Sequence, residues 1–320
     1  MKPPATISVD LDNLWAYLRV HGDDAWRSFP SYLDLAVPRL VGFFSGRGLR
    51  PTVFVVGQDA ELDENQEAFA RLAETGWELG NHSFHHEPWL HQRSLEAIDE
   101  ELARAEEAIE SATGARPQGF RGPGYSLSGK LLQVLHRRGY AYDASTLPSF
   151  IGPFARLYYF LHSSLPPEER RRRAGLFGTL SHGLRPLTPY RWAFQGGELL
   201  ELPISAFPLL RVPFHISYVL YLSTFSAAAA RAYFNLALCA CRATGVAPSL
   251  LFHPLDFLGS DNAPGLEFFP GMGLPSQVKL QRVADYVDAF TRLFEAGPLG
   301  ELAASLAERA SSLPTRVLED

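Results

Sequence analysis

The chain has 320 residues, of which 20% are charged and 46% hydrophobic, proportions that are ordinary for a folded globular protein. Its formal net charge is −6, with 29 Lys and Arg against 35 Asp and Glu, so it has no overall basic field that would hold nucleic acid. These values exclude a disordered or fibrous chain, and nucleic acid is not expected as a partner. The length suits one α/β barrel of about 250 residues with insertions.

The chain contains two cysteines, Cys239 and Cys241, which stand two residues apart in an apolar stretch. Side chains at this spacing point to different sides of a helix, and no second pair is present to complete a zinc site. We interpret them as small apolar residues of a helix, which suits a reducing compartment. The N-terminal residues contain no apolar core of a secretory signal, so we expect a cytoplasmic location.

Short apolar runs alternate with amphipathic stretches along most of the chain. Strands are predicted at residues 6–10, 52–56, 78–82, 119–121, 140–143, 199–204 and 249–252. Helices are predicted at residues 32–47, 62–75, 93–113, 128–138, 226–243 and 277–295. This β-α-β-α order predicts an α/β fold with a parallel sheet, closed or open, in a single domain over residues 1–320 that ends in helices over 277–312.

Two stretches interrupt this alternation. Residues 151–192 contain seven Arg and two Glu, so this basic, aromatic-rich insertion carries +5 while the rest of the chain carries −11. Two interpretations remain open: a surface that contacts an anionic membrane or a lipid-linked substrate, or a solvated Arg run beside an extra core helix. The second stretch, 203–225, is apolar and aromatic but contains Pro and Arg, so neither stretch is expected to span a bilayer.

Polar clusters follow the first and third predicted strands. Asp10 and Asp12 end the first strand, and side chains two residues apart on an extended chain share a face, so both carboxylates can enter one cavity. His82 and His86 follow the third strand at a spacing of four residues, which lets two imidazoles reach one ion from a tight loop. His85 is then expected to point elsewhere. Each pattern alone is weak evidence for a metal site.

Three more polar clusters follow later strands. Arg121 begins an Arg-Gly-Pro-Gly-Tyr turn, in which two glycines let backbone N–H groups approach a ligand closely, as an oxyanion hole requires. Asp143 follows the fifth strand, and His253 closes a later apolar strand. Five polar clusters at the carboxyl ends of strands are what a barrel active site needs, because its catalytic groups lie on that face.

In order and content, these segments resemble the five motifs of the polysaccharide deacetylases, the NodB-homology domain of carbohydrate esterase family 4. The resemblance spans residues 6–254, and its specific parts are the Asp-x-Asp pair, the His-Ser-x-x-His pair and the Arg-x-Pro-Gly turn. It implies a distorted (β/α)₇ barrel and metal-dependent hydrolysis of an N-acyl group, usually N-acetyl, on an amino sugar. The Asp-x-Asp form is similar to a branch that includes cytoplasmic deacetylases.

The same resemblance implies the metal ligands and the base. Asp12, His82 and His86 would bind one divalent ion, with Zn²⁺ as the first choice and Co²⁺, Ni²⁺ or Mn²⁺ as alternatives. The ion lowers the pKa of its water and polarises the acyl oxygen. Asp10 would then take the proton from the attacking water as the general base.

The resemblance also implies the remaining roles. His253 would protonate the leaving amine, and Asp143 would pair with His253 to keep it cationic. Arg121 would hold Asp10 ionised and oriented. A backbone N–H near Gly124 or Tyr125 would stabilise the oxyanion.

The sequence departs from the common family pattern in three motifs. The first motif usually reads Asp-Asp-Gly, whereas this chain has Asp10-Leu-Asp12-Asn13. The third motif usually has an aromatic residue where Gly124 stands, which leaves the oxyanion donor open. The fourth motif lacks the usual Trp after its Asp, which weakens the role of Asp143.

Three functions remain open on the sequence alone. The first is a metal-dependent deacylase of an amino sugar or glycan, presented on a lipid carrier or at the inner face of a membrane through residues 151–192. The second is an allantoinase-like amidohydrolase acting on a cyclic or ureido amide. The third is a barrel without catalysis that binds glycans, which is disfavoured because every expected catalytic position is filled.

Overall fold

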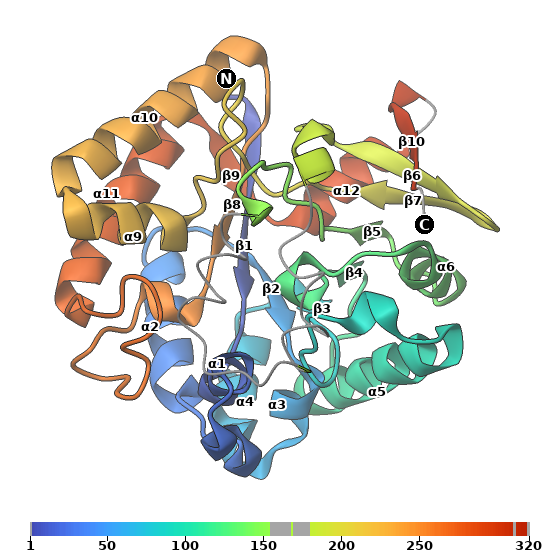
Figure 1. Cartoon of the computed structure of the whole chain (residues 1–320), viewed down its shortest axis with the longest axis horizontal. Coiled ribbons are helices and arrows are strands. Elements are labelled where there is room, and N and C mark those ends of the chain that lie inside the picture. The colour runs from blue at the N-terminus through green and yellow to red at the C-terminus, as the bar shows by residue number, and fades with distance from the viewer. Residues whose placement is uncertain (1, 154–167, 169–179, 310–311, 319–320) are drawn as a thin grey trace.

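A parallel sheet forms the centre of the computed structural model, which describes residues 2–153, 168, 180–309 and 312–318 (Figure 1). Its parallel strands are β1 (Pro4–Asp10), β2 (Thr52–Val55), β3 (Leu79–Asn81), β4 (Gly119–Phe120), β5 (Tyr142–Asp143), β7 (Gly197–Glu201) and β8 (Ser249–Phe252). They lie in the order β7-β5-β4-β3-β2-β1-β8. β1 is therefore a central strand, and its residues from Ala5 onward are buried. This arrangement confirms the α/β class and the predicted parallel pairing.

Three further strands extend the sheet. β6 (Tyr190–Phe194) pairs antiparallel with β7, and β10 (Thr315–Val317) pairs parallel with β6 at the far edge. β9 (Glu295–Gly297) pairs with the beginning of β1. These three strands were not predicted from the sequence.

Helices cover the sheet on both sides. Those that match predicted helices are α2 (Leu33–Ser45), α4 (Gln66–Glu74), α5 (Leu95–Thr113), α6 (Gly129–Arg137), α10 (Ala227–Thr244), α11 (Ser276–Leu293) and α12 (Leu299–Ala307). Helices without a predicted counterpart are α1 (Leu14–His21), α3 (Gly57–Glu61) and α9 (Ile216–Phe225). Figure 1 shows α9, α10 and α11 grouped on the β8 side, and α5 and α6 on the side of β3 to β5.

Short 3₁₀ turns connect several of these elements. They are η1 (Asp24–Ser28), η2 (Asp63–Asn65), η3 (Leu90–Gln92), η4 (Pro123–Tyr125), η5 (Leu180–Leu184) and η6 (Pro254–Asp256). Two of them follow polar residues at strand ends: η6 begins directly after His253, and η4 begins two residues after Arg121. They therefore fix the backbone around Arg121 and His253.

The described strand order does not close into a ring, because β8 and β10 are its two ends. The segment after β7 nevertheless makes backbone hydrogen bonds to both β5 and β8. Leu202 N–H donates to Asp143 O of β5 at 2.9 Å, and Ser205 N–H donates to Ser249 O of β8 at 3.1 Å. The closed (β/α)₇ barrel and the single-domain organisation stay predictions.

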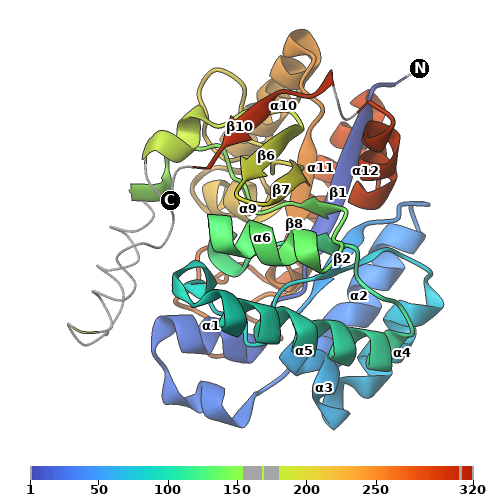
Figure 2. The same ribbon diagram turned by 90° about the vertical axis from the view of Figure 1, so that its right-hand side faces the viewer.

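The predicted insertion at 151–192 lies mainly outside the described residues, since residues 154–167 and 169–179 are not part of them. Its described part includes η5 and β6, which Figure 2 shows beside β7 and β10. Within the described part of the chain, no helix combines the length and the apolar character needed to cross a bilayer.

Candidate metal centre and active site

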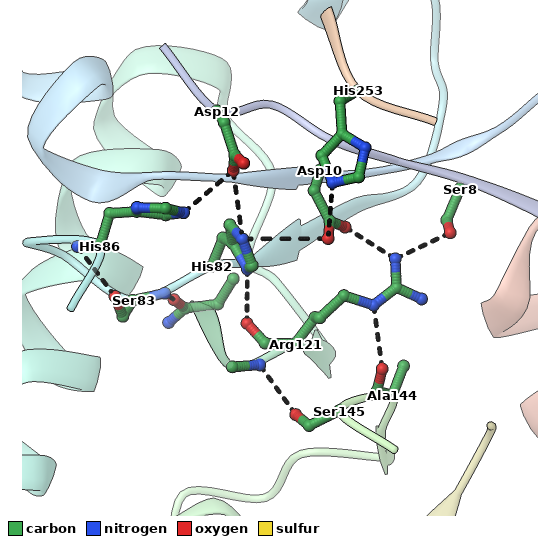
Figure 3. Close-up of polar contacts among 12 residues, drawn as sticks. Ser8, Asp10, Asp12, His82, Ser83, His86, Arg121, Ala144, Ser145 and His253 are labelled. Carbon is green, nitrogen blue, oxygen red and sulfur yellow. Dashed lines mark hydrogen bonds and ion pairs between the residues drawn. The ribbon is translucent and has the colours of Figure 1, made fainter. Parts of the chain in front are cut away.

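The predicted site residues converge at the carboxyl ends of four parallel strands (Figure 3). Asp10 is the last residue of β1, His82 follows β3, Arg121 follows β4 and His253 follows β8. Neighbouring parallel strands end at the same edge of a sheet, so these side chains meet although up to 243 positions separate them in the sequence. All of them lie in the protein interior except His253, which is partly exposed.

Asp12, His82 and His86 form a cluster whose ligand atoms all lie within 4.8 Å of one another. Asp12 Oδ1 is 3.3 Å from His82 Nε2 and 3.0 Å from His86 Nε2. Although both atoms are buried, Asp12 Oδ1 and His86 Nε2 have no hydrogen-bond partner among the described residues. Buried polar atoms without partners are costly, and two imidazole nitrogens with one carboxylate oxygen are ligands that Zn²⁺ and related ions take. The donor set therefore fits the divalent ion that the sequence predicts.

The loop that carries the two histidines is held in an unusual backbone conformation. Ser83 and His86 have positive φ values of 62° and 50°, which non-glycine residues rarely adopt. Two hydrogen bonds hold this loop: Ser83 N–H donates to Asn81 Oδ1 at 2.7 Å, and His86 N–H donates to Ser83 Oγ at 3.1 Å. The imidazole rings of His82 and His86 consequently lie with centroids 5.0 Å apart.

His82 is oriented by a backbone carbonyl. Its Nδ1 is 2.6 Å from Arg121 O, and a carbonyl only accepts, so Nδ1 carries a hydrogen and Nε2 faces Asp12. Burial lowers the pKa of His82, but the charges of Asp10 and Asp12 outweigh it and raise that pKa above its ordinary value. Burial raises the pKa of Asp12, but the two histidines outweigh it and hold that pKa well below its ordinary value.

Asp10 is held by the fully buried side chain of Arg121. Arg121 Nη1 donates to Asp10 Oδ1 at 2.7 Å and to Ser8 Oγ at 2.8 Å, while its Nε donates to Ala144 O at 2.9 Å. The second oxygen of Asp10, Oδ2, lies 4.0 Å from Nε2 of His82 and 4.0 Å from Nε2 of His253. The guanidinium supplies the counter-charge of the buried carboxylate and leaves one carboxylate oxygen facing the site.

His253 has partners that the sequence analysis missed. Its Nδ1 lies 2.8 Å from Ser217 Oγ on α9, and its backbone N–H donates to Asp256 Oδ2 at 2.8 Å. The Ser217 hydroxyl in turn hydrogen-bonds to the Asp256 side chain. Because Asp256 is the third residue of the turn that His253 begins, the pair forms a capping box, and this local His-x-x-Asp pattern was the available signal.

The predicted pairing of Asp143 with His253 is wrong. No hydrogen bond or ion pair joins these two described residues; Asp143 instead accepts a hydrogen bond from Ser145 Oγ at 2.6 Å and interacts with Glu201. The register of the sheet explains this, because Asp143 on β5 lies opposite Glu201 on β7, whereas His253 follows β8 at the other end of the strand order.

Comparisons with known proteins agree with this site. The polysaccharide deacetylase family model matches residues 23–142, which include His82, His86 and Arg121. The peptidoglycan deacetylase of Helicobacter pylori is 28% identical over 151 residues, 46% of this chain and 50% of that protein. The peptidoglycan deacetylase-like protein FGM2 of Gibberella zeae is 34% identical over 98 residues, 30% of this chain and 26% of that protein. The chain therefore spans half or less of these curated relatives.

A crystal structure of a polysaccharide-deacetylase-like protein from Mycobacterium smegmatis has the same fold, with a TM-score of 0.61 over 100% of this chain and 99% of that chain at 21% identity. Residues 23–142 of this chain therefore resemble the polysaccharide deacetylases, and the likeness to the Mycobacterium smegmatis protein shows a shared fold. Asp10, Asp12 and His253 lie outside the residues matched by the family model. Asp10 and Asp12 nevertheless lie within 4.0 Å of His82, and His253 lies 4.0 Å from Asp10, so this convergence is an independent geometric result.

The turn after Arg121 distinguishes the two predicted oxyanion donors. The N–H of Tyr125 donates to Gly122 O at 2.9 Å, whereas the N–H of Gly124 has no partner within the described residues. Gly124 has φ 58°, a conformation that glycine adopts without strain. Gly124 is thus the better candidate of the two. Burial and the charge of Asp10 raise the pKa of Tyr125, so its hydroxyl keeps its proton.

His85, which the sequence analysis left out of the metal site, points away from it. Its Nδ1 lies 2.6 Å from Oε2 of the buried Glu101 on α5. Burial raises the pKa of Glu101, but the hydrogen bonds from His85 outweigh it and lower that pKa below its ordinary value. His85 therefore links the histidine loop to α5. A substitution of His85 is a suitable control for substitutions of His82 and His86.

Proposed function

We propose that the protein is a metal-dependent hydrolase that removes an N-acyl group, in the first place N-acetyl, from an amino sugar of a glycan. The observation that carries this proposal is the convergence of a buried Asp-His-His cluster with a carboxylate and a histidine, each placed for proton transfer. The name of the Helicobacter pylori relative, a peptidoglycan deacetylase, supports an N-acetyl amino sugar as the substrate.

The side chains suit the steps of amide hydrolysis. Asp12, His82 and His86 would hold a divalent ion, with Zn²⁺ as the first choice, which would supply an activated water and polarise the acyl carbonyl. Asp10 accepts the proton of the attacking water at Oδ2, while Arg121 holds the other carboxylate oxygen. The free N–H of Gly124 is available to the developing oxyanion.

His253 donates the proton that the leaving amine needs. Its Nε2 faces the site, 4.0 Å from Asp10 Oδ2, while its Nδ1 is occupied by Ser217. The proton to be transferred therefore sits on Nε2. Ser217 and Asp256 fix the ring in this orientation. The sequence analysis had assigned the role of partner of His253 to Asp143.

Metal content and acetate release together test the function. Purified protein is expected to hold about one transition-metal ion per chain and to release acetate from N-acetylated glucosamine oligomers or peptidoglycan fragments. His82→Ala is expected to lose both properties, whereas His85→Ala keeps the metal. Asp10→Asn keeps the metal but loses about 10²-fold or more of the rate. A protein that binds no metal after reconstitution, or a His82→Ala variant that hydrolyses at the original rate, contradicts the proposal.

A narrower proposal is that the glycan is presented on a lipid carrier at a membrane surface. The sequence of residues 151–192 supports it with seven Arg against two Glu. Exposed leucines also support it, since Leu184 of η5 is 74% exposed and Leu209 after β7 is 83% exposed. Binding to anionic lipid vesicles is the measurement that tests this proposal.

A further inference from the structure

One peptide group connects the metal ligand His82 to a buried serine. The carbonyl of the Arg121–Gly122 peptide accepts from His82 Nδ1 at 2.6 Å, and the N–H of the same peptide donates to Ser145 Oγ at 2.8 Å (Figure 3). Gly122 packs closely against the backbone of Ser126, since a Cβ built on it would lie 2.1 Å from Ser126 O and no other residue fits here. The two hydrogen bonds therefore act on the same rigid, planar unit.

Ser145 is in turn anchored to Asp143. Its hydroxyl donates to Asp143 Oδ1 at 2.6 Å, and its backbone N–H donates to Asp143 Oδ2 at 3.3 Å. A serine hydroxyl has one hydrogen to give, so once that hydrogen points to Asp143, only its lone pairs face the N–H of Gly122. Asp143 and Ser145 are both fully buried, which excludes water from this chain of hydrogen bonds.

Glu201 completes the chain on the far side of Asp143. It is fully buried, lies opposite Asp143 in the sheet, and accepts from Thr146 N–H at 3.0 Å and Trp192 Nε1 at 2.8 Å. No ion pair reaches either carboxyl group among the described residues. Burial and the adjacent Asp143 raise the pKa of Glu201 well above its ordinary value, and burial also raises the pKa of Asp143, against the hydrogen bonds that it accepts from Ser145. Of the two carboxyl groups, Asp143 is therefore the one that carries the negative charge more readily.

We infer that Asp143 and Ser145 are positioning residues for the metal ligand His82, acting through the Arg121–Gly122 peptide. Hydrogen bonds in a series polarise one another, so donation by the Gly122 N–H makes the Arg121 carbonyl a stronger acceptor for His82 Nδ1–H. A partner at the outer nitrogen of a ligating histidine fixes its tautomer and increases its basicity toward the ion. This inference rests on the proposed metal site. It assigns Asp143 a positioning role for His82, whereas the sequence predicted that Asp143 pairs with His253.

Zinc affinity of two serine variants tests the inference. Ser145→Ala removes the acceptor of the Gly122 N–H, and we expect its zinc dissociation constant to rise about 10-fold or more in chelator competition. Ser205→Ala is the matched control, because Ser205 is also a buried serine whose hydroxyl accepts a backbone N–H, that of Ser249 at 2.5 Å. Its dissociation constant is expected to stay within about 2-fold of the original. Asp143→Asn, which keeps the shape and removes the charge, should weaken zinc binding in the same direction as Ser145→Ala.

A second measurement on the metal-free protein reports His82 directly. With ¹⁵N-labelled histidine, the Nδ1–H tautomer of His82 is expected in the original protein and in Ser205→Ala, and a mixture of tautomers in Ser145→Ala. Equal zinc affinity of Ser145→Ala and the original protein overturns the inference, and so does equal weakening in both serine variants. A protein that binds no zinc at all contradicts the proposed function instead, whereas zinc binding without acetate release leaves the inference standing.

Discussion

Asp10 and Asp12 lie two residues apart at the end of β1, yet their surroundings give them different chemistry. Asp12 faces two imidazole nitrogens, which hold its pKa well below its ordinary value and suit it to bind a cation. Asp10 faces the Arg121 guanidinium with one oxygen and the site with the other. The extended backbone points both side chains to one face. Their different neighbours then make Asp12 suitable as a metal ligand and Asp10 suitable as the base.

Ser217→Ala is expected to lower the rate of acetate release about tenfold. Removing the hydroxyl leaves His253 Nδ1 without its hydrogen-bond partner. The imidazole that protonates the leaving amine is then no longer held in the orientation that turns Nε2 toward Asp10. Steady-state rates on an N-acetylated glucosamine oligomer measure this loss.

The control for this experiment is Ser223→Ala on the same helix. Ser223 is buried in α9, but its hydroxyl donates to Leu220 O and accepts from Arg282, away from His253. Its rate should stay close to that of the original protein. A Ser217→Ala rate equal to that of Ser223→Ala would show that Ser217 only supports the helix.

At the scale of elements, the sequence predicts those whose ends or periodicity are locally encoded. The helix predicted at 93–113 is α5, because Ser94 caps its first turn and Gly114, with φ 71°, ends it. β8 has the predicted bounds, since four buried apolar or small residues stand between turns. α9 was not predicted, because its residues are apolar on all sides and show no amphipathic period. β10 forms only by pairing with the distant β6.

The same distinction separates the predicted and missed site residues. Polar residues at the ends of parallel strands are predictable, because the fold brings strand ends together, and the structure places Asp12, His82 and His86 within ligand distance of one another. Ser217 was missed because a serine at the start of an unpredicted helix carries no motif. The partner of Asp143 depends on β7 lying next to β5, a neighbour relation that the alternation of strands and helices leaves open.

The N-terminus of α9 gives an expected pH dependence of stability. His215 is the N-cap of this helix and accepts the Tyr218 N–H at Nδ1, which requires a neutral ring. Burial and the nearby His253 lower the pKa of His215 from 6.5 to about 3. The unfolded chain takes up this proton below pH 6.5 and the folded chain does not, so this stabilisation is present above pH 6.5 and lost as the pH falls toward 3.

His215→Asn removes the titration and keeps a capping side chain. Between pH 7 and pH 5, the free energy of unfolding of the original protein should fall about 2 kcal/mol more than that of His215→Asn. Urea denaturation at the two pH values measures this difference. His136→Asn, which changes an exposed histidine on α6, should follow the original protein; an equal fall in His215→Asn would disprove the assignment.

At the scale of the whole molecule, charge and exposed apolar surface are distributed unevenly. Residues 151–192 carry +5, whereas the rest of the chain carries −11. The described ends of this region adjoin the loop after β7, where Arg211 Nη1 donates to Arg185 O at 2.6 Å. In Figure 2, the yellow-green turn of η5 lies beside this yellow loop at the upper left. An anionic surface would attract this basic segment of the chain and repel the acidic remainder.

We therefore expect the protein to bind vesicles that contain anionic lipids and not vesicles of phosphatidylcholine alone. Leu209 and Leu210, 83% and 58% exposed on the loop after β7, are expected to enter the interface, each contributing about 1 kcal/mol of apolar burial. The double variant Leu209→Ser/Leu210→Ser should then sediment with anionic vesicles about tenfold more weakly. Leu236→Ser, which changes a 60% exposed leucine on α10, should bind as the original does.

Salt separates the two contributions to this binding. Raising NaCl from 50 to 500 mM weakens attraction between the Arg side chains and the lipid headgroups, whereas apolar insertion persists, so the two leucines should account for most of the residual binding in high salt. Equal binding to neutral and anionic vesicles would contradict the charge argument. No binding to either would leave the deacetylase proposal intact but remove the lipid-linked substrate from it, and soluble glycan fragments would then become the substrates to compare.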